Sequence, residues 1–334
     1  MAGAAVGGAE TYFADLVTAL ARAGLDQRAA IRIDPARSRT LLTAGLPVQQ
    51  LRFGSWFDFG TRRALARAFA NDRPTIVQSW MSRATQRMPS GPFVHVGWLG
   101  GYYAPRTFRD CRHVVGVTPD IARHLRDGGF PPERVHYLPT FATAQPAPAV
   151  ARATLTTPED VPLLLALGRL HAKKGFDVLL QALTRVPRAW LWIAGDGPLD
   201  AELRALAVQL GVADRVRFLG WRTDREALLA ACDACVMPSR YEPFGTVMIE
   251  AWAAQRPLIA AAAAGPKGLL RDGTDALMVP IDDADALARA IARVIESADL
   301  AAALAGAGFA VYQDRFTEAA VVRQYMDFYQ RIAA

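Results

Sequence analysis

The stretch that decides the fold reads Pro238-Ser-Arg-Tyr-Glu-Pro-Phe-Gly-Thr-Val-Met-Ile-Glu-Ala251. The apolar run 234–237 before it predicts a short buried strand. Residues 246–255 contain no helix breaker and predict a helix. A phosphate or pyrophosphate suits such a helix N-terminus, because its amides are unpaired and its dipole is positive. Gly245 lets the backbone approach a ligand, and Thr246 can cap the helix or donate a hydrogen bond.

Two carboxylates bracket this loop: Glu242 lies before the helix, and Glu250 lies inside it eight positions later. A helix that begins near Gly245 puts Glu250 in its second turn, roughly one pitch (~5 Å) from the phosphate end. One acid can then face the group beyond the phosphates while the other faces the group behind them. The alternative is a helix cap at Glu242 and a solvated helix residue at Glu250.

A second glycine-bearing turn, Gly168-Arg-Leu-His-Ala-Lys-Lys-Gly175, follows the apolar run 163–167, which predicts a strand. Arg169 and Lys174 lie at the carboxyl end of this strand, where open α/β sheets bind ligands. Two cations there can neutralise a diphosphate. The alternative is two exposed loop cations. Lysine occurs only at positions 173, 174 and 267, which favours a specific use of Lys174.

These strings resemble the Glu-x7-Glu and Gly-Arg-Leu…Lys-Gly elements of retaining glycosyltransferases of family 4 (group 1). The resemblance implies the GT-B fold, an α/β architecture in which two Rossmann-like domains face each other across a cleft. It implies that Glu242 contacts the donor sugar and Glu250 the ribose, and that Arg169 and Lys174 hold the pyrophosphate. Glu242, Arg169 and Lys174 are the implied catalytic residues. The implied nucleotide-sugar-binding residues are Gly7, Gly8, Gly168, Gly195, Asp196, Phe244, Gly245, Thr246, Val247 and Glu250.

The activity implied by the resemblance is transfer of a sugar, of the hexosyl type, from a UDP- or GDP-linked donor to an acceptor hydroxyl. The anomeric configuration would be retained. No metal and no cofactor is expected, because two cations and a helix dipole would stabilise the departing diphosphate. The implied setting is synthesis of surface polysaccharide, lipopolysaccharide or glycolipid. A GT-B epimerase or phosphorylase, or a nucleotide-sugar-binding protein without turnover, are the alternatives.

The remaining sequence predicts two domains, for which 334 residues suffice. Short apolar runs alternate with helical patterns, which predicts parallel sheets covered by helices. Residues 142–159, rich in Ala, Pro and Thr, predict a linker. We therefore expect an acceptor-binding domain at 1–142, completed by a C-terminal helix at 315–334, and a nucleotide-sugar-binding domain at 143–314.

The beginning of the chain departs from the family pattern. A glycine loop at 3–8 leads into a predicted helix at 9–23, but only Met1 and Ala2 precede the loop where the family has its first strand. Either a central strand is missing or the start lies upstream. The later loop 97–103, with three glycines and three aromatic residues, could bind an acceptor or pack at the domain edge.

Composition and charge limit the location and the partners. The chain is 52% hydrophobic, has no apolar run near the ~20 residues of a membrane span, and has three cysteines, which favours a cytoplasmic protein with buried thiols. Residues 1–142 hold 18 Arg against 10 acids, a charge of +8, whereas the remainder is −2. Such a domain suits an anionic membrane surface or a phosphorylated glycolipid; scattered solvated arginines are the alternative. No nucleic-acid motif is present.

Overall fold

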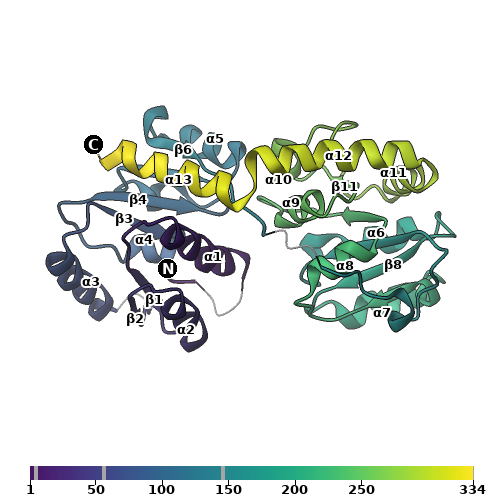
Figure 1. Ribbon diagram of the computed structural model, residues 1–334, viewed down its shortest axis with the longest axis horizontal. Coiled ribbons are helices and arrows are strands. Elements are labelled where there is room, and N and C mark those ends of the chain that lie inside the picture. Colours follow the sequence, from purple (N-terminus) through teal and green to yellow (C-terminus); the bar gives the residue numbers. More distant parts are fainter. Residues whose placement is uncertain (4–6, 55–57, 144–146, 334) are drawn as a thin grey trace. The chain divides into compact units, whose positions relative to one another are not determined.

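The computed structural model describes residues 1–3, 7–54, 58–143 and 147–333, and the chain divides into two compact units (Figure 1). Unit 1 consists of Met1–Thr140 and Glu318–Ala334, and unit 2 consists of Phe141–Thr317. The boundaries expected from the sequence, at 142 and 315, differ from these by two and three residues. Each unit is an α/β structure with parallel strands.

Unit 2 contains one six-stranded parallel sheet in the order β12-β11-β10-β7-β8-β9, counted over the described residues. Its first strand, β7, lies between β10 and β8, so the strand order reverses beside β7. Ligands of open parallel sheets bind outside the carboxyl ends of the strands at such a reversal. The strands are β7 (Leu163–Leu167), β8 (Trp190–Ala194), β9 (Val216–Phe218), β10 (Ala234–Met237), β11 (Leu258–Ala261) and β12 (Leu277–Val279).

Helices cover both faces of this sheet. One core cluster joins α6, α7 and α11 to one face, whereas α8 and α9 contact the strands from the other. Every residue of β7 and β10 is buried, which is why both strands are continuously apolar rather than alternating. The helices are α6 (Phe176–Leu183), α7 (Asp200–Gln209), α8 (Arg225–Ala231), α9 (Thr246–Ala253), α10 (Ala264–Leu269), α11 (Ala284–Glu296) and α12 (Ala298–Arg315), with 3₁₀ turns η3 (Arg152–Leu155), η4 (Ala172–Lys174) and η5 (Ala213–Arg215).

The expected linker, 142–159, is packed structure in its second half. Arg152 donates to both carboxylate oxygens of Asp233 at 3.0 Å. The Thr157 hydroxyl accepts a hydrogen bond of 2.9 Å from the indole of the buried Trp192. These few contacts with residues distant in sequence hold the second half of the segment against unit 2. The Ala/Pro/Thr composition of the segment could not reveal them.

Within the described residues of unit 1 there are two parallel sheets, one in the order β3-β4-β5-β6 and one that pairs β1 with β2. The strands are β1 (Ala29–Arg32), β2 (Val48–Leu51), β3 (Ile76–Trp80), β4 (Val94–Leu99), β5 (His113–Gly116) and β6 (Val135–Tyr137). The helices are α1 (Gly8–Arg22), α2 (Pro35–Thr43), α3 (Phe59–Asp72), α4 (Met81–Gln86), α5 (Pro119–Asp127) and α13 (Glu318–Ala333), with 3₁₀ turns η1 (Pro105–Phe108) and η2 (Pro132–Arg134). Within the described ranges, no individual helix has both the length and the apolar character to cross a bilayer; α11 together with the bent segment Ala298–Ala333 meets these criteria only as a pair.

The first two residues lie along β1. The amino group of Met1 donates to the Ala30 carbonyl at 2.6 Å, and the Met1 carbonyl accepts from the Arg32 amide at 2.9 Å. Met1 and Ala2 are both buried. These two residues therefore occupy the position of a strand neighbouring β1, where the family pattern predicts its first strand.

The last helix, α13, packs against unit 1. The Trp98 indole donates to the Tyr325 hydroxyl at 3.0 Å, and the Tyr329 hydroxyl donates to the Gln78 side chain at 2.9 Å. Trp98 also stacks on Trp80, with ring centroids 4.2 Å apart. Buried aromatic contacts thus join the end of the chain to the strands β3 and β4.

The cysteines Cys111, Cys232 and Cys235 are free and buried. Burial raises the pKa of the Cys111 and Cys232 thiols to about 12, so they stay protonated and unreactive at neutral pH. The prediction of buried structural thiols is confirmed. In the part of the chain that the structure describes, no group of three or more His, Cys, Asp or Glu is arranged to hold a metal ion.

Candidate active site

Three glycine-bearing turns touch one another at the carboxyl ends of β7 and β8 and beyond β9. Gly168 donates its amide to the Ala194 carbonyl at 3.0 Å, and Gly195 donates to the Gly220 carbonyl at 2.7 Å. A Cβ atom on Gly195 would lie 1.9 Å from the Gly168 carbonyl oxygen, and Gly195 has φ +148°. Only glycine permits this approach, which brings the predicted residues Gly168 and Gly195 together.

The two predicted motifs meet at an ion pair between Lys174 and Glu242, which are 68 positions apart in the sequence. Their side chains are only 24% and 12% exposed. Gly175 allows the loops to approach, because a Cβ atom there would lie 2.1 Å from the Pro238 carbonyl oxygen. The geometry therefore brings a predicted phosphate-binding cation and a predicted sugar-binding acid into direct contact.

Arg240, which the sequence analysis did not single out, connects the loop 238–245 to the segment 172–177. Its guanidinium donates to both carboxylate oxygens of Asp177, at 2.8 and 2.6 Å, and to the Ala172 carbonyl at 2.8 Å. Although burial acts in the opposite direction, these bonds hold the pKa of Asp177 below its ordinary value. The pair is bidentate and joins distant segments, so no local pattern could have revealed it.

Glu250 is a largely buried acid, with a side chain only 13% exposed, rather than a solvated helix residue. One carboxylate oxygen accepts from Arg225 at 2.7 Å. The other is buried and, among the described residues, has no hydrogen-bond partner. Burial raises the pKa of Glu250, and Arg225 counteracts part of this rise. An unpaired buried acceptor costs roughly 1–3 kcal/mol, so this oxygen is suited to receive a donor from a ligand.

The helix that follows the motif, α9, begins without a side-chain cap. Gly245 is its N-cap residue with φ +93°, and no side chain accepts from the first turn. The amides of Thr246 and Val247 are therefore available to an anion. The side chain of Phe244 is buried and packs edge-on against Phe316, so this residue offers only its backbone to a ligand.

The other predicted site residues make no hydrogen bond or ion pair with the Lys174–Glu242 pair among the described interactions. Arg169 is exposed and, in the described ranges, makes no hydrogen bond or ion pair. Asp196 is exposed in the turn after Gly195, and its carbonyl accepts from Leu170 at 2.9 Å. Gly7 and Gly8 belong to unit 1, where Gly7 is the N-cap of α1. Their participation in a donor site stays a prediction.

Trp221 is a further residue that the sequence analysis missed. It follows Gly220 in the turn after β9, and its side chain is 65% exposed. The available signal was a tryptophan directly after a strand-ending glycine. An exposed indole beside the Gly195–Gly220 contact is a candidate surface for a nucleotide base.

Comparison with known proteins identifies relatives for both units. Residues 6–144 match the family described as Glycosyltransferase Family 4, and residues 161–297 match Glycosyl transferases group 1. Two Rhizobium meliloti proteins, the lipopolysaccharide core biosynthesis glycosyltransferases LpsD and LpsE, are 36% and 35% identical to the chain. The alignments cover 97% and 96% of this chain and 95% of each relative. A solved structure, Anabaena HepE in complex with UDP and glucose, superposes with a TM-score of 0.82 at 21% identity, covering 99% of this chain and 98% of that one.

Proposed function

The chain belongs to glycosyltransferase family 4, group 1, a family of transferases with the GT-B fold, and we propose that it moves a sugar from a nucleotide diphosphosugar to an acceptor hydroxyl with retention of configuration. The observation that carries this proposal is the Lys174–Glu242 pair beside the strand reversal of unit 2. A paired cation and acid at this edge suit a substrate that presents a diphosphate next to a polyhydroxylated ring.

Lys174, Arg169 and the N-terminus of α9 would stabilise the leaving group. As the bond between the anomeric carbon and the diphosphate oxygen breaks, negative charge develops on the nucleoside diphosphate. The acceptor oxygen bonds to the same carbon, and its proton is released. Two cations and free amides that are already in place lower the barrier because they require little rearrangement at that moment.

Glu242 would act in two stages. Without a donor it neutralises Lys174. A bound diphosphate competes for that ammonium, and the carboxylate is then free to accept hydrogen bonds from hydroxyls of the donor sugar. Its charge also favours an oxocarbenium-like transition state.

Glu250 would receive the ribose of the nucleotide. Its unpaired buried oxygen is an acceptor without a donor, and a ribose hydroxyl is a donor of the required kind. Arg225 holds the other oxygen and so fixes the orientation of the carboxylate. We favour UDP as the nucleotide, on the basis of its presence in the Anabaena structure.

The acceptor is proposed to be a glycan of the lipopolysaccharide core, because both Rhizobium meliloti relatives carry that description over nearly their whole length. A cytoplasmic location at the inner face of the membrane and independence from metal ions are parts of the same proposal.

The proposal is tested by incubating the purified protein with UDP- and GDP-sugars and a core oligosaccharide acceptor, and measuring release of nucleoside diphosphate. We expect Glu242→Gln to lower kcat by about 100-fold while UDP binding is retained or strengthened, because Lys174 is freed. Glu202→Gln, an exposed acid on α7, is the matched control and should leave kcat unchanged. The anomeric configuration of the product, read by NMR, tests retention.

Two outcomes would contradict the proposal. Stabilisation by UDP with no product over long incubation would assign the chain to nucleotide-sugar binding without turnover. Equal kcat values for Glu242→Gln and the parent protein would remove Glu242 from the reaction.

A further inference from the structure

Unit 1 contains a polar cavity that the proposed transfer reaction does not use. Its volume is about 630 Å³. It opens at the amino ends of β4 and β5, whereas ligands of parallel sheets ordinarily bind at the carboxyl ends. Its walls come from α3, the end of α4, the loop before β4 and the connection from η1 to β5. The cavity shares no residue with the donor site in unit 2.

The charged residues around this cavity are mostly arginines. Arg62, Arg106, Arg109 and Arg112 line it against a single acid, Asp110. In the described part of the chain, Arg62, Arg106 and Arg112 have no hydrogen-bond or ion-pair partner for their guanidinium groups. Arg109 has only a contact of 3.8 Å with Asp110, in which both side chains are more than four-fifths exposed. Four guanidinium groups near one cavity that is lined by a single acid create a local excess of positive charge.

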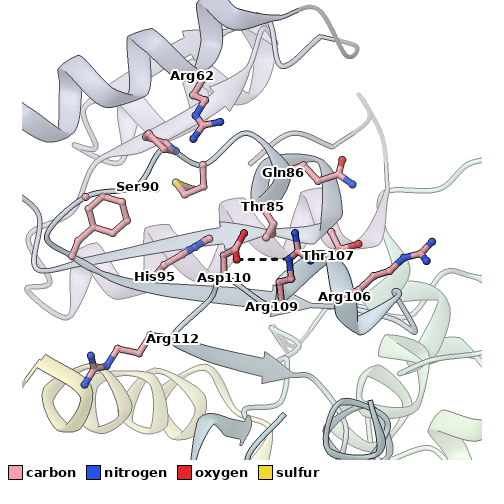
Figure 2. A pocket seen from close by; sticks show the side chains of 14 residues that line it. Arg62, Thr85, Gln86, Ser90, His95, Arg106, Thr107, Arg109, Asp110 and Arg112 are labelled. Atoms are coloured by element: carbon pink, nitrogen blue, oxygen red, sulfur yellow. Dashed lines mark ion pairs between the residues drawn. The ribbon is translucent and has the colours of Figure 1, made fainter. Parts of the chain in front are cut away.

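Figure 2 shows how these side chains lie. The Arg62 side chain extends from α3 on one side of the cavity, and the Arg109 side chain extends from the segment after η1 on the opposite side. His95 lies beside Asp110 in this view, whereas Arg106 and Arg112 lie at two ends of the cavity and point away from its centre. Arg62 and Arg109 can therefore contact one small ligand from two sides, and the outer pair adds to the attracting field.

The floor of the cavity is held in place by hydrogen bonds. His95 lies 2.9 Å from the Ser79 hydroxyl, which in turn lies 2.8 Å from the hydroxyl of Thr85. Burial lowers the pKa of His95 to about 4, so its imidazole is neutral near pH 7. A bound anion would favour the protonated ring and raise this pKa. The histidine therefore provides a spectroscopic reporter of ligand charge.

We propose that this cavity binds a phosphomonoester group, as carried by a phosphorylated sugar, a glycerol phosphate or a lipid headgroup. Guanidinium groups match the oxygen geometry of phosphate, and two of them facing each other suit a dianion better than a single carboxylate. The volume lies in the range of small-ligand sites, about 300–1,000 Å³, which leaves room for the group that bears the phosphate. Met88, Pro89 and Phe93 supply apolar wall for its carbon skeleton.

Isothermal titration calorimetry at low ionic strength tests the proposal with two probes: sn-glycerol 3-phosphate, and phosphatidylcholine vesicles with and without phosphatidate. We expect binding that weakens at least about tenfold in the double variant Arg62→Gln/Arg109→Gln. The control is Arg63→Gln/Arg67→Gln, which removes the same charge from exposed positions of α3 outside the cavity. Near-ultraviolet circular dichroism from the stacked Trp80–Trp98 pair verifies that unit 1 stays folded.

The two probes distinguish the source of the phosphate. Cavity-dependent binding of glycerol 3-phosphate, with a rise in the pKa of His95 seen by NMR, assigns a soluble phosphomonoester. Cavity-dependent binding of phosphatidate vesicles alone assigns a lipid headgroup. Binding that falls equally in the control variant reflects net charge only and overturns the proposal, as does the absence of binding by either probe. Glycosyl transfer is measured separately, so the two proposals can fail independently.

Discussion

The two units use their cations in opposite ways. In unit 2 two cations of the candidate active site are paired, Lys174 with Glu242 and Arg225 with Glu250, whereas Arg169 makes no ion pair among the described residues. In unit 1 Arg62 and Arg109 approach the cavity from opposite sides, Arg106 and Arg112 lie at its ends, and Asp110 is the single acid among the lining residues. A paired cation is oriented before its ligand arrives, which suits stabilisation of a transition state. Unpaired cations attract an anion but do not orient it as strictly.

The backbones of the two units also differ, in the continuity of their sheets and in how closely their turns pack. Unit 2 has one continuous sheet whose turns are in van der Waals contact through Gly168, Gly175 and Gly195. Unit 1 has a separate two-stranded and four-stranded sheet. Unit 2 should therefore tolerate little change at its turns, whereas unit 1 depends more on its aromatic core.

The largest expected effect tests whether pairing marks the reactive cation. Lys174→Ala should lower kcat/KM about 100- to 1,000-fold, because it removes a charge next to the leaving diphosphate. Lys173→Ala is the matched control: its ammonium lies 4.7 Å from the ring centre of Tyr241 and makes no contact with Glu242. We expect less than a threefold change there. Equal losses of kcat/KM in steady-state assays of both variants would show that the ion pair does not mark the reactive cation.

The next effect tests the close contact between turns of unit 2. Gly195→Ala should lower the free energy of unfolding by about 2–4 kcal/mol, because its Cβ atom would overlap the Gly168 carbonyl at a φ that alanine rarely adopts. Gly211 also has a positive φ, +68°, but nothing lies within 4 Å of an added Cβ atom, so Gly211→Ala is the control. We expect about 1 kcal/mol for this control. Urea unfolding followed by tryptophan fluorescence measures both.

The third effect is an opposite response of the two units to pH. Burial lowers the pKa of His95 and of His136 from 6.5 to about 4. Between these values the unfolded chain binds more protons than the folded one, so unit 1 loses stability as pH falls from 6.5 towards 4. After allowance for solvent at these partly exposed rings, each should contribute about 1–2 kcal/mol. For Glu250 the sign is reversed: its raised pKa lowers the stability of unit 2 as pH rises above 4.5.

Thermal unfolding between pH 4 and 7.5 measures this response, with the Trp80–Trp98 signal reporting on unit 1. His95→Gln and His136→Gln should each flatten the acid side of the profile. Glu250→Gln should leave the acid side unchanged. An acid transition of the same steepness in the two histidine variants would exclude these rings as its cause.

The smallest effect concerns what attaches α13 to unit 1. The ion pair between Arg22 and Glu318 is 2.6 Å long, but its side chains are 60% and 34% exposed. Arg22→Gln should therefore cost less than about 0.5 kcal/mol. Tyr325→Phe, which leaves the buried Trp98 indole without its acceptor, should cost about 1–3 kcal/mol in the same unfolding assay. The reverse order would show that surface charge attaches this helix.

Local pattern predicted the central elements of unit 2 well, because β7 and β10 are continuous apolar runs and α9 begins after a glycine-bearing turn. The helix expected at 246–255 is α9, Thr246–Ala253. The short helix α10, Ala264–Leu269, contains Pro266 in its first turn. A proline in the first turn of a helix loses no hydrogen bond there, so Pro266 is compatible with the start of α10.

The candidate site was predicted as a set of residue types, and its contacts were not. The sequence analysis placed Glu242 and Lys174 in one site because their motifs resemble those of a family. It gave no indication of the clamp from Arg240 to Asp177, of the burial of Glu250 or of the exposed Trp221. The arginine cavity of unit 1 was visible only as an excess of charge.

The sequence by itself indicated the family, the parallel α/β class and the residues of the candidate phosphate-binding motifs, because apolar periodicity, glycines and short polar strings are local properties of the chain. The tertiary structure alone decided which charges are paired. Lys174 meets Glu242, and Arg62 faces Arg109, only after strands and helices far apart in sequence have packed side by side. Pairing depends on distances of a few ångströms between such segments. An ion pair fixes the orientation of a cation, whereas an unpaired cation can attract an anion.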